Sequence, residues 1–148
     1  MKKTSGGIAT QRKDQANLLI LLKEAQSRLG YLPREVLKEF ADSHGVSISE
    51  LFGVASFYSF LYTRPKGRYV IRICKSLPCF INNSEMIVKA VEQEIGIKPG
   101  ETTEDGKFSF ELTNCIGACD QAPAMMINSE VYGDLTPEKI SSLLKSLD

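Results

Sequence analysis

Residues 69–79, with the sequence YVIRICKSLPC, decide how the second half of the chain folds. Tyr69, Ile71 and Ile73 stand at alternate positions, and side chains two residues apart point to the same face of a β-strand. The pattern therefore predicts a strand over residues 69–74 that delivers Cys74 at its end. Cys79 follows after four intervening residues, so a close pair of cysteines lies at the end of this strand.

A similar arrangement recurs at residues 108–119, with the sequence FSFELTNCIGAC. Phe108, Phe110 and Leu112 alternate with polar residues, which predicts a half-buried strand leading to Cys115. Three residues separate Cys115 from Cys119, and the chain has four cysteines in all. Because loops that follow strand ends converge at one edge of a sheet, we expect the two cysteine pairs to meet there.

The remaining patterns after residue 67 complete a small α+β domain. They predict a helix that is closed by Gly96, a hairpin over residues 124–132 and a last helix that begins at Thr136-Pro137-Glu138. The predicted order is β-α-β-β-β-α, a small sheet with helices packed against it.

Upstream of residue 67 the hydrophobic spacing is helical. It predicts one helix that stops at Gly30, a second that follows Pro33, and a third that opens with the capping box Ser47 to Glu50 and runs toward Phe60. We expect a flexible N-terminus over 1–11, a helical partner-docking segment over 12–66 and the β-containing domain over 67–148. Part of the third helix is expected to be an interface, because it gathers the aromatic residues Phe52, Phe57, Tyr58, Phe60 and Tyr62.

Composition excludes several classes of function. The 148 residues carry 18 basic and 18 acidic side chains, so no general field attracts nucleic acid. A signal-peptide hydrophobic region is missing, and the longest apolar run, Leu18 to Leu22, is far too short to cross a bilayer. We expect a cytoplasmic protein with no direct membrane insertion, in which cysteines serve metal or redox chemistry rather than structural disulfides.

The spacing of the cysteines favours an iron–sulfur centre. Structural zinc sites draw their pairs from tight knuckles, whereas a [2Fe-2S] cluster accepts thiolates from wider and more irregular loops. A redox dithiol usually has two residues between its cysteines, and these pairs have four and three. A zinc-binding structural or adaptor module and a thiol–disulfide pair stay open as alternatives.

A cluster with four thiolates is negatively charged, so its burial calls for backbone N–H groups that point at sulfur. Gly117 and Ala118 allow the main chain to wrap closely, whereas the loop from Lys75 to Pro78 is expected to be stiffer, because Pro78 has no N–H. From proximity in sequence, we assign one iron to Cys74 and Cys79 and the other to Cys115 and Cys119.

These motifs resemble the thioredoxin-like [2Fe-2S] ferredoxin family. The resemblance rests on Cys74-x4-Cys79, Cys115-Ile-Gly-Ala-Cys119, Ala122-Pro123, the sequence YGDLTPE at 132–138, and the upstream segments GYLP at 30–33 and GVASFY at 53–58. The chain departs from the pattern in the loop 75–78, where many relatives carry small residues and a glycine. It departs again at Phe80, where relatives often have histidine.

The resemblance implies a thioredoxin-like domain with one [2Fe-2S] cluster per chain, held by Cys74, Cys79, Cys115 and Cys119, and no catalytic residue. Family members include the 24 kDa-type subunit of NADH:quinone oxidoreductase (complex I) and small subunits of NAD-linked hydrogenases, some electron-bifurcating, and of formate dehydrogenases. The expected role is single-electron exchange with an FMN- and NAD(H)-binding flavoprotein subunit, in a complex with further iron–sulfur and catalytic subunits.

Overall fold

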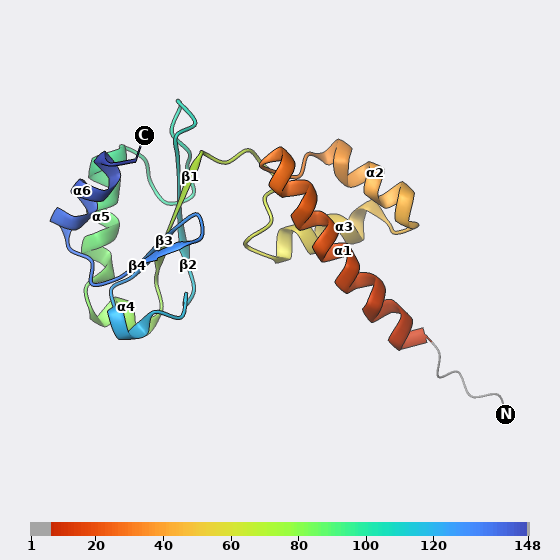
Figure 1. Ribbon diagram of the computed structural model, residues 1–148, viewed down its shortest axis with the longest axis horizontal. Coiled ribbons are helices and arrows are strands. Elements are labelled where there is room, and N and C mark those ends of the chain that lie inside the picture. The colour runs from red at the N-terminus through yellow and green to blue at the C-terminus, as the bar shows by residue number, and fades with distance from the viewer. Residues whose placement is uncertain (1–6, 148) are drawn as a thin grey trace. The chain divides into compact units, whose positions relative to one another are not determined.

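The structure is a computed structural model that describes residues 7–147, with side chains from Leu18 onward. The chain separates into two compact units, with the division between Pro65 and Lys66 (Figure 1). No helix within residues 7–147 is both long and apolar enough to cross a membrane.

The first unit consists of three helices, α1 (Gly7–Leu29), α2 (Arg34–His44) and α3 (Ile48–Phe57). α1 begins at Gly7, so residues 7–11 of the stretch expected to be flexible are helical, and residues 1–6 lie outside the described part of the chain. α3 ends three residues before Phe60, because Tyr58 adopts an extended backbone with φ −86° and ψ 112°.

One apolar core joins the three helices of the first unit. Its buried members are Leu18, Leu22, Leu32, Leu37, Ala41, Leu51, Ala55 and Leu61. The Ser47 hydroxyl accepts a hydrogen bond of 3.1 Å from the Glu50 N–H, as the capping pattern predicts. The Gln26 side chain donates to the Phe60 carbonyl at 2.8 Å and accepts from the Tyr62 N–H at 2.6 Å. These bonds tie the segment that leaves α3 back to α1.

The second unit has a four-stranded mixed sheet with helices. Its elements are β1 (Tyr69–Cys74), α4 (Leu77–Ile81), α5 (Ser84–Ile95), β2 (Phe108–Thr113), the short 3₁₀ turn η1 (Cys119–Gln121), β3 (Met125–Ile127), β4 (Glu130–Tyr132) and α6 (Pro137–Lys145). The strand order is β2-β1-β3-β4, with β1 parallel to β2 and antiparallel to β3. The predicted order of strands and the two predicted helices are confirmed, and α4 is an addition.

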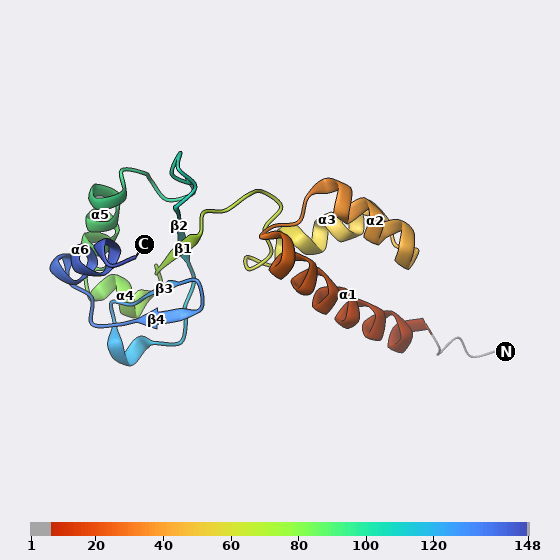
Figure 2. The same ribbon diagram turned by 45° about the horizontal axis from the view of Figure 1, so that its top comes forward.

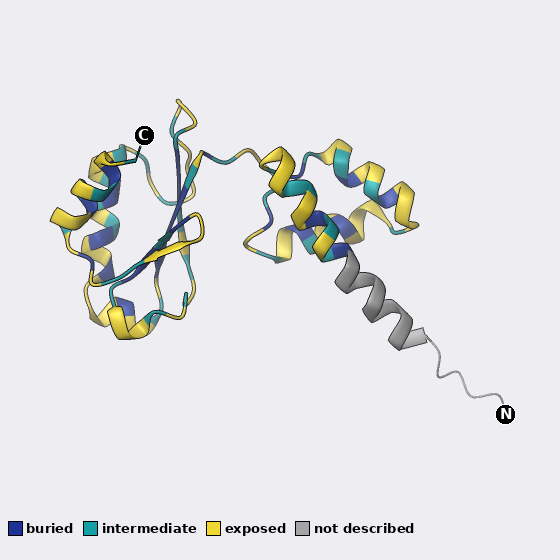
Figure 3. Cartoon of the chain, in the orientation of Figure 1, coloured by how far each residue is buried: buried dark blue, intermediate teal, exposed yellow. Residues whose placement is uncertain are grey.

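Helices α5 and α6 lie together against one face of the sheet (Figures 1 and 2). The core between them and the sheet is buried throughout (dark blue in Figure 3). It is formed by Ile71, Ile73, Ile87, Val91, Phe108, Phe110, Met125, Ile127, Leu135, Ile140 and Leu144.

The opposite face of β1 is buried as well, although it carries a charge. Arg72 is 7% exposed, and its Nε donates to Glu111 Oε2 at 3.2 Å across the β1–β2 pairing. Lys66 contacts the other oxygen of the same carboxylate. A buried arginine of this kind is tolerated because its charge is paired and its N–H groups are hydrogen-bonded.

The sequence predicts a stiff loop between Cys74 and Cys79, but part of this segment forms helix α4. Ser76 occupies the N-cap position with an extended backbone, and Pro78 lies in the first turn. A first-turn residue has no helical partner for its N–H, so proline is tolerated there and does not block the helix. Cys79 is therefore placed by a helix.

Replacing Gly67 with alanine is expected to lower the free energy of unfolding of the second unit by about 1–3 kcal/mol. A β-carbon there would lie 2.6 Å from the carbonyl carbon of Phe108, and this backbone belongs to β2 and cannot easily yield. The Gly67 N–H also donates to Ser109 Oγ at 2.7 Å, which holds the two segments together. Urea denaturation followed by circular dichroism measures the change.

Gly53→Ala is the control for this substitution. Gly53 lies inside α3, and a β-carbon added there would have no neighbouring atom within 4 Å, so alanine should stabilise the helix by about 0.5–1 kcal/mol. An unchanged unfolding midpoint for Gly67→Ala would show that β2 moves aside at no cost.

Candidate metal centre

The fold brings the four cysteines to one edge of the sheet of the second unit. Cys74 is the last residue of β1, and Cys79 lies in α4 directly beyond it. Because β1 and β2 are parallel and Cys74 pairs with Thr113, the loop that carries Cys115 leaves from the same edge. Cys119 begins η1 a few residues later. The expected convergence of the two cysteine pairs is confirmed.

The thiols are arranged as two pairs. Cys115 Sγ and Cys119 Sγ are 3.5 Å apart, and the Cys74 and Cys79 side chains shift each other's pKa. Charge on Cys74 acts on Cys119, and charge on Cys119 acts on Cys79, so the two pairs share one electrostatic environment. All four thiols are free of disulfides.

The two pairs differ sharply in exposure. Cys74 and Cys79 are each 1% exposed, whereas Cys115 and Cys119 are exposed to solvent. Ala124 is buried against the inner pair, and Ile116, Ala118 and Ala122 pack around it. One half of the site is therefore enclosed in an apolar shell, and the other half faces outward.

Burial raises the pKa of the Cys74 thiol, but hydrogen bonds from Ser76, Cys79 and the Ile116 backbone outweigh it, so the net pKa is lowered. Burial also raises the pKa of Cys79. The Ala124 backbone acts in the opposite direction, but the neighbouring Cys74 and Cys119 raise the pKa further. The pKa of Cys119 is raised mainly by its hydrogen bond with Cys115 and by the charge of that residue. Thiolates packed this closely repel one another, and a bound cation removes that repulsion.

A backbone N–H group donates to sulfur in the loop of the exposed pair. The Gly117 N–H donates to Cys115 Sγ at 3.4 Å, and Gly117 has a φ of +85°, which favours glycine. The backbone groups of Ser76 and Ile116 lower the pKa of Cys74, and that of Ala124 acts to lower the pKa of Cys79. The donor expected from the Gly117 loop is present, and the influence of Ser76 and Ala124 was not foreseen, because it depends on α4 and on the approach of β3.

The sequence YGDLTPE at 132–138 supports the loop of the exposed pair. The Asp134 N–H donates to the Gln121 carbonyl at 2.7 Å, and the Leu135 N–H donates to the Pro123 carbonyl at 3.2 Å. Gly133 allows this approach, because a β-carbon there would overlap Gln121 Cβ. The segment between β4 and α6 is thus bonded directly to the residues that follow Cys119.

Two thiol pairs supply the number of ligands that a two-iron cluster takes. A [2Fe-2S] core needs two thiolates at each iron and stabilisation of its negative charge, and the Gly117 N–H already donates to Cys115 Sγ.

Comparison with known proteins gives a consistent family. The family model described as thioredoxin-like [2Fe-2S] ferredoxin matches residues 5–148. The chain is 44% identical over 124 residues to a subunit of the NADH-quinone oxidoreductase of Escherichia coli K12, covering 84% of this chain and 75% of that subunit. It is 38% identical over 130 residues to the NADP-reducing hydrogenase subunit HndA of Solidesulfovibrio fructosivorans, covering 88% of this chain and 76% of that subunit.

A solved structure is also similar. The match is to a NAD+-reducing [NiFe]-hydrogenase in the air-oxidized state, with a TM-score of 0.78 and 28% sequence identity. It covers 88% of this chain and 22% of the hydrogenase chain, so the present chain spans about a fifth of that protein's length.

In the metal-free protein, iodoacetamide is expected to alkylate Cys115 and Cys119 before Cys74 and Cys79. The lowered pKa of Cys74 favours its reactive thiolate, but the enclosed pair is out of reach of the reagent. Mass spectrometry of tryptic peptides assigns the order, because cleavage after Lys75 separates Cys74 from Cys79. Labelling in urea is the control and should remove the difference. Early labelling of Cys74 would contradict the enclosure of the inner pair.

Proposed function

This chain belongs to the thioredoxin-like [2Fe-2S] ferredoxin family, and from that premise we propose that it is the electron-transfer subunit of a multisubunit NAD(H)-linked oxidoreductase. The cofactor of the family is one [2Fe-2S] cluster. The observation that carries the proposal is the meeting of two thiol pairs at one sheet edge, with the Gly117 N–H bonded to Cys115 Sγ. The parent complex is a hydrogenase or a NADH:quinone oxidoreductase, the two classes to which the named relatives belong.

In this proposal Cys74 and Cys79 bind one iron, and Cys115 and Cys119 bind the other. When bound, the cluster takes up and releases one electron at a time. The residues of the chain hold it, exclude water on the side of the enclosed pair, and stabilise negative charge through the Gly117 N–H and through the backbone at Ser76 and Ala124, which favours the thiolate form. The exposed pair leaves the other side accessible.

A flavoprotein is the partner that this chemistry requires. NAD(H) exchanges a hydride, which carries two electrons, whereas an iron–sulfur centre exchanges one. A flavin converts between the two, so the partner is a subunit that binds FMN and NAD(H). Further iron–sulfur and catalytic subunits complete the complex.

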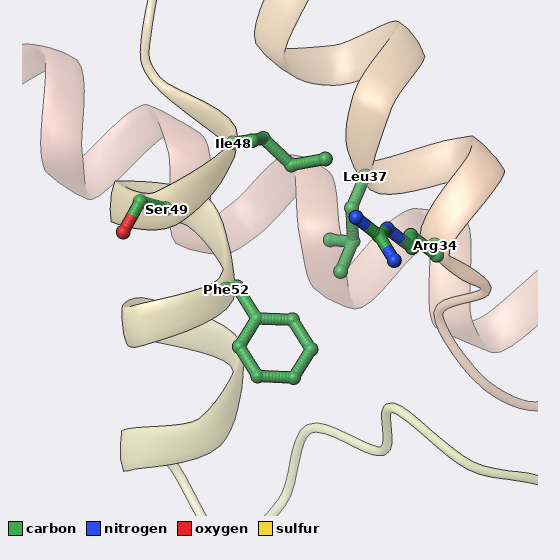
Figure 4. Close-up of a pocket in the computed structure, with 5 residues that line it drawn as sticks. All are labelled: Arg34, Leu37, Ile48, Ser49 and Phe52. Carbon is green, nitrogen blue, oxygen red and sulfur yellow. The ribbon is translucent and has the colours of Figure 1, made fainter.

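The first unit supplies the surface that anchors this partner. Phe52, Phe57 and Phe60 are 50%, 79% and 40% exposed, which is costly in water and typical of interfaces. Between α2 and α3 there is a hollow of about 360 Å³ lined by Arg34, Leu37, Ile48, Ser49 and Phe52 (Figure 4). Its apolar floor suits an apolar side chain of the partner, and Arg34 at its rim suits a carboxylate beside it.

The test is to purify the tagged chain anaerobically together with its flavin-containing partner and to reduce the complex. Dithionite should give an EPR signal of about one spin per chain from the cluster. NADH or NADPH should give the same signal only when the flavoprotein is present. Cys74→Ser and Cys115→Ser should each shift or abolish the signal. A colourless, EPR-silent protein with stoichiometric zinc would leave a structural module instead.

A further inference from the structure

We propose that the outer face of α4, together with Met86 of α5, is the surface on which the flavin-bearing subunit lies when it exchanges electrons with the cluster. The inference rests on the proposed function, and it names the contact through which that function operates. The residues Leu77, Phe80, Ile81 and Met86 are called the α4 patch below.

The α4 patch is strongly exposed for apolar side chains. Leu77 and Ile81 are each 67% exposed, Phe80 is 53% exposed and Met86 is 49% exposed. Four of the five residues of α4 are exposed. Phe80, Ile81 and Met86 line one open hollow of about 490 Å³, so these side chains share a continuous surface. Apolar patches of this kind mark sites of interaction.

The orientation of α4 is fixed by the metal site. Cys79 is 1% exposed and packs with Cys74 and Ala124, so the helix must turn this residue inward. The other side chains of α4 then point outward, and they stay exposed because no described element of the second unit packs over them. The exposure of the patch is thus a consequence of how Cys79 is held.

The α4 patch lies on the solvent-facing side of the helix that carries Cys79 and covers the inner thiol pair. Phe80 follows Cys79 directly in the sequence, and Leu77 lies two residues before Cys79. A protein that lies on the patch is therefore separated from the inner thiols by little more than the helix itself. Electron transfer slows steeply with distance, so contact at this point shortens the path between the cluster and a cofactor of the partner.

The size and charge of the patch favour this occupant over a second copy of the chain. A stable interface buries about 1,600 Å² and uses about 20–30 residues a side, whereas weak electron-transfer contacts are smaller. Four side chains are too few for a stable dimer, but they suffice where the partner is already anchored by another surface. The hollow also carries Glu85 and Lys89, charges of opposite sign. We therefore expect the matching surface of the partner to be apolar and to need no net charge.

The test compares surface variants in the purified complex with the flavoprotein. Phe80→Ser with Ile81→Ser should slow reduction of the cluster by NADH or NADPH by about tenfold or more, as loss of a central apolar contact does. Met86→Lys alters the same hollow from α5 and leaves α4 intact, and it should slow reduction in the same direction. The dithionite-reduced EPR signal should be unchanged in both, which shows an intact cluster.

Val131→Ser is the matched control, because Val131 is 47% exposed on β4 and does not line the hollow. It should reduce at the rate of the unaltered protein. Unchanged rates for Met86→Lys would overturn the inference, as would a dimer of the chain that Met86→Lys dissociates without slowing reduction. If NADH or NADPH fails to reduce the unaltered complex while dithionite succeeds, the proposed function fails instead.

Discussion

The parallel pairing of β1 with β2 is the constraint on which the site depends. The register sets Cys74 opposite Thr113, so the two strands end together and their following loops start side by side. The crossover through α5 that a parallel pair requires is stabilised by the core between the sheet and its two helices. Hydrophobic burial far from the sulfur atoms therefore determines whether the two thiol pairs can meet.

The site that results has two unlike halves. The inner half is attached to regular structure, with Cys74 on a strand and Cys79 on a helix, and it is closed by Ala124. The outer half lies on a loop whose shape depends on Gly117 and on bonds from the segment after β4. Rigidity and enclosure in the inner half are thus combined with solvent exposure in the outer half.

The features that could be predicted from the sequence are those that depend on local patterns of residues. The alternation around Ile71 and Phe110 predicts both parallel strands, and the glycine and proline signals predict the ends of α5 and the start of α6. It missed α4, because five residues are too short for a helical period to show. The influence of the Ser76 and Ala124 backbone on the pKa of the enclosed thiols was also missed, since it depends on α4 and on the packing of the segment before β3.

The bonds from Asp134 and Leu135 to the residues after Cys119 bear on the order in which the molecule forms. Chains emerge from the ribosome N-terminus first, so β1 and α4 are complete well before the segment at 132–138 exists. The outer thiol pair acquires its final support only when synthesis has nearly ended. A nascent chain thus holds half a site, and premature termination before Gly133 would leave Cys115 and Cys119 on an unsupported loop.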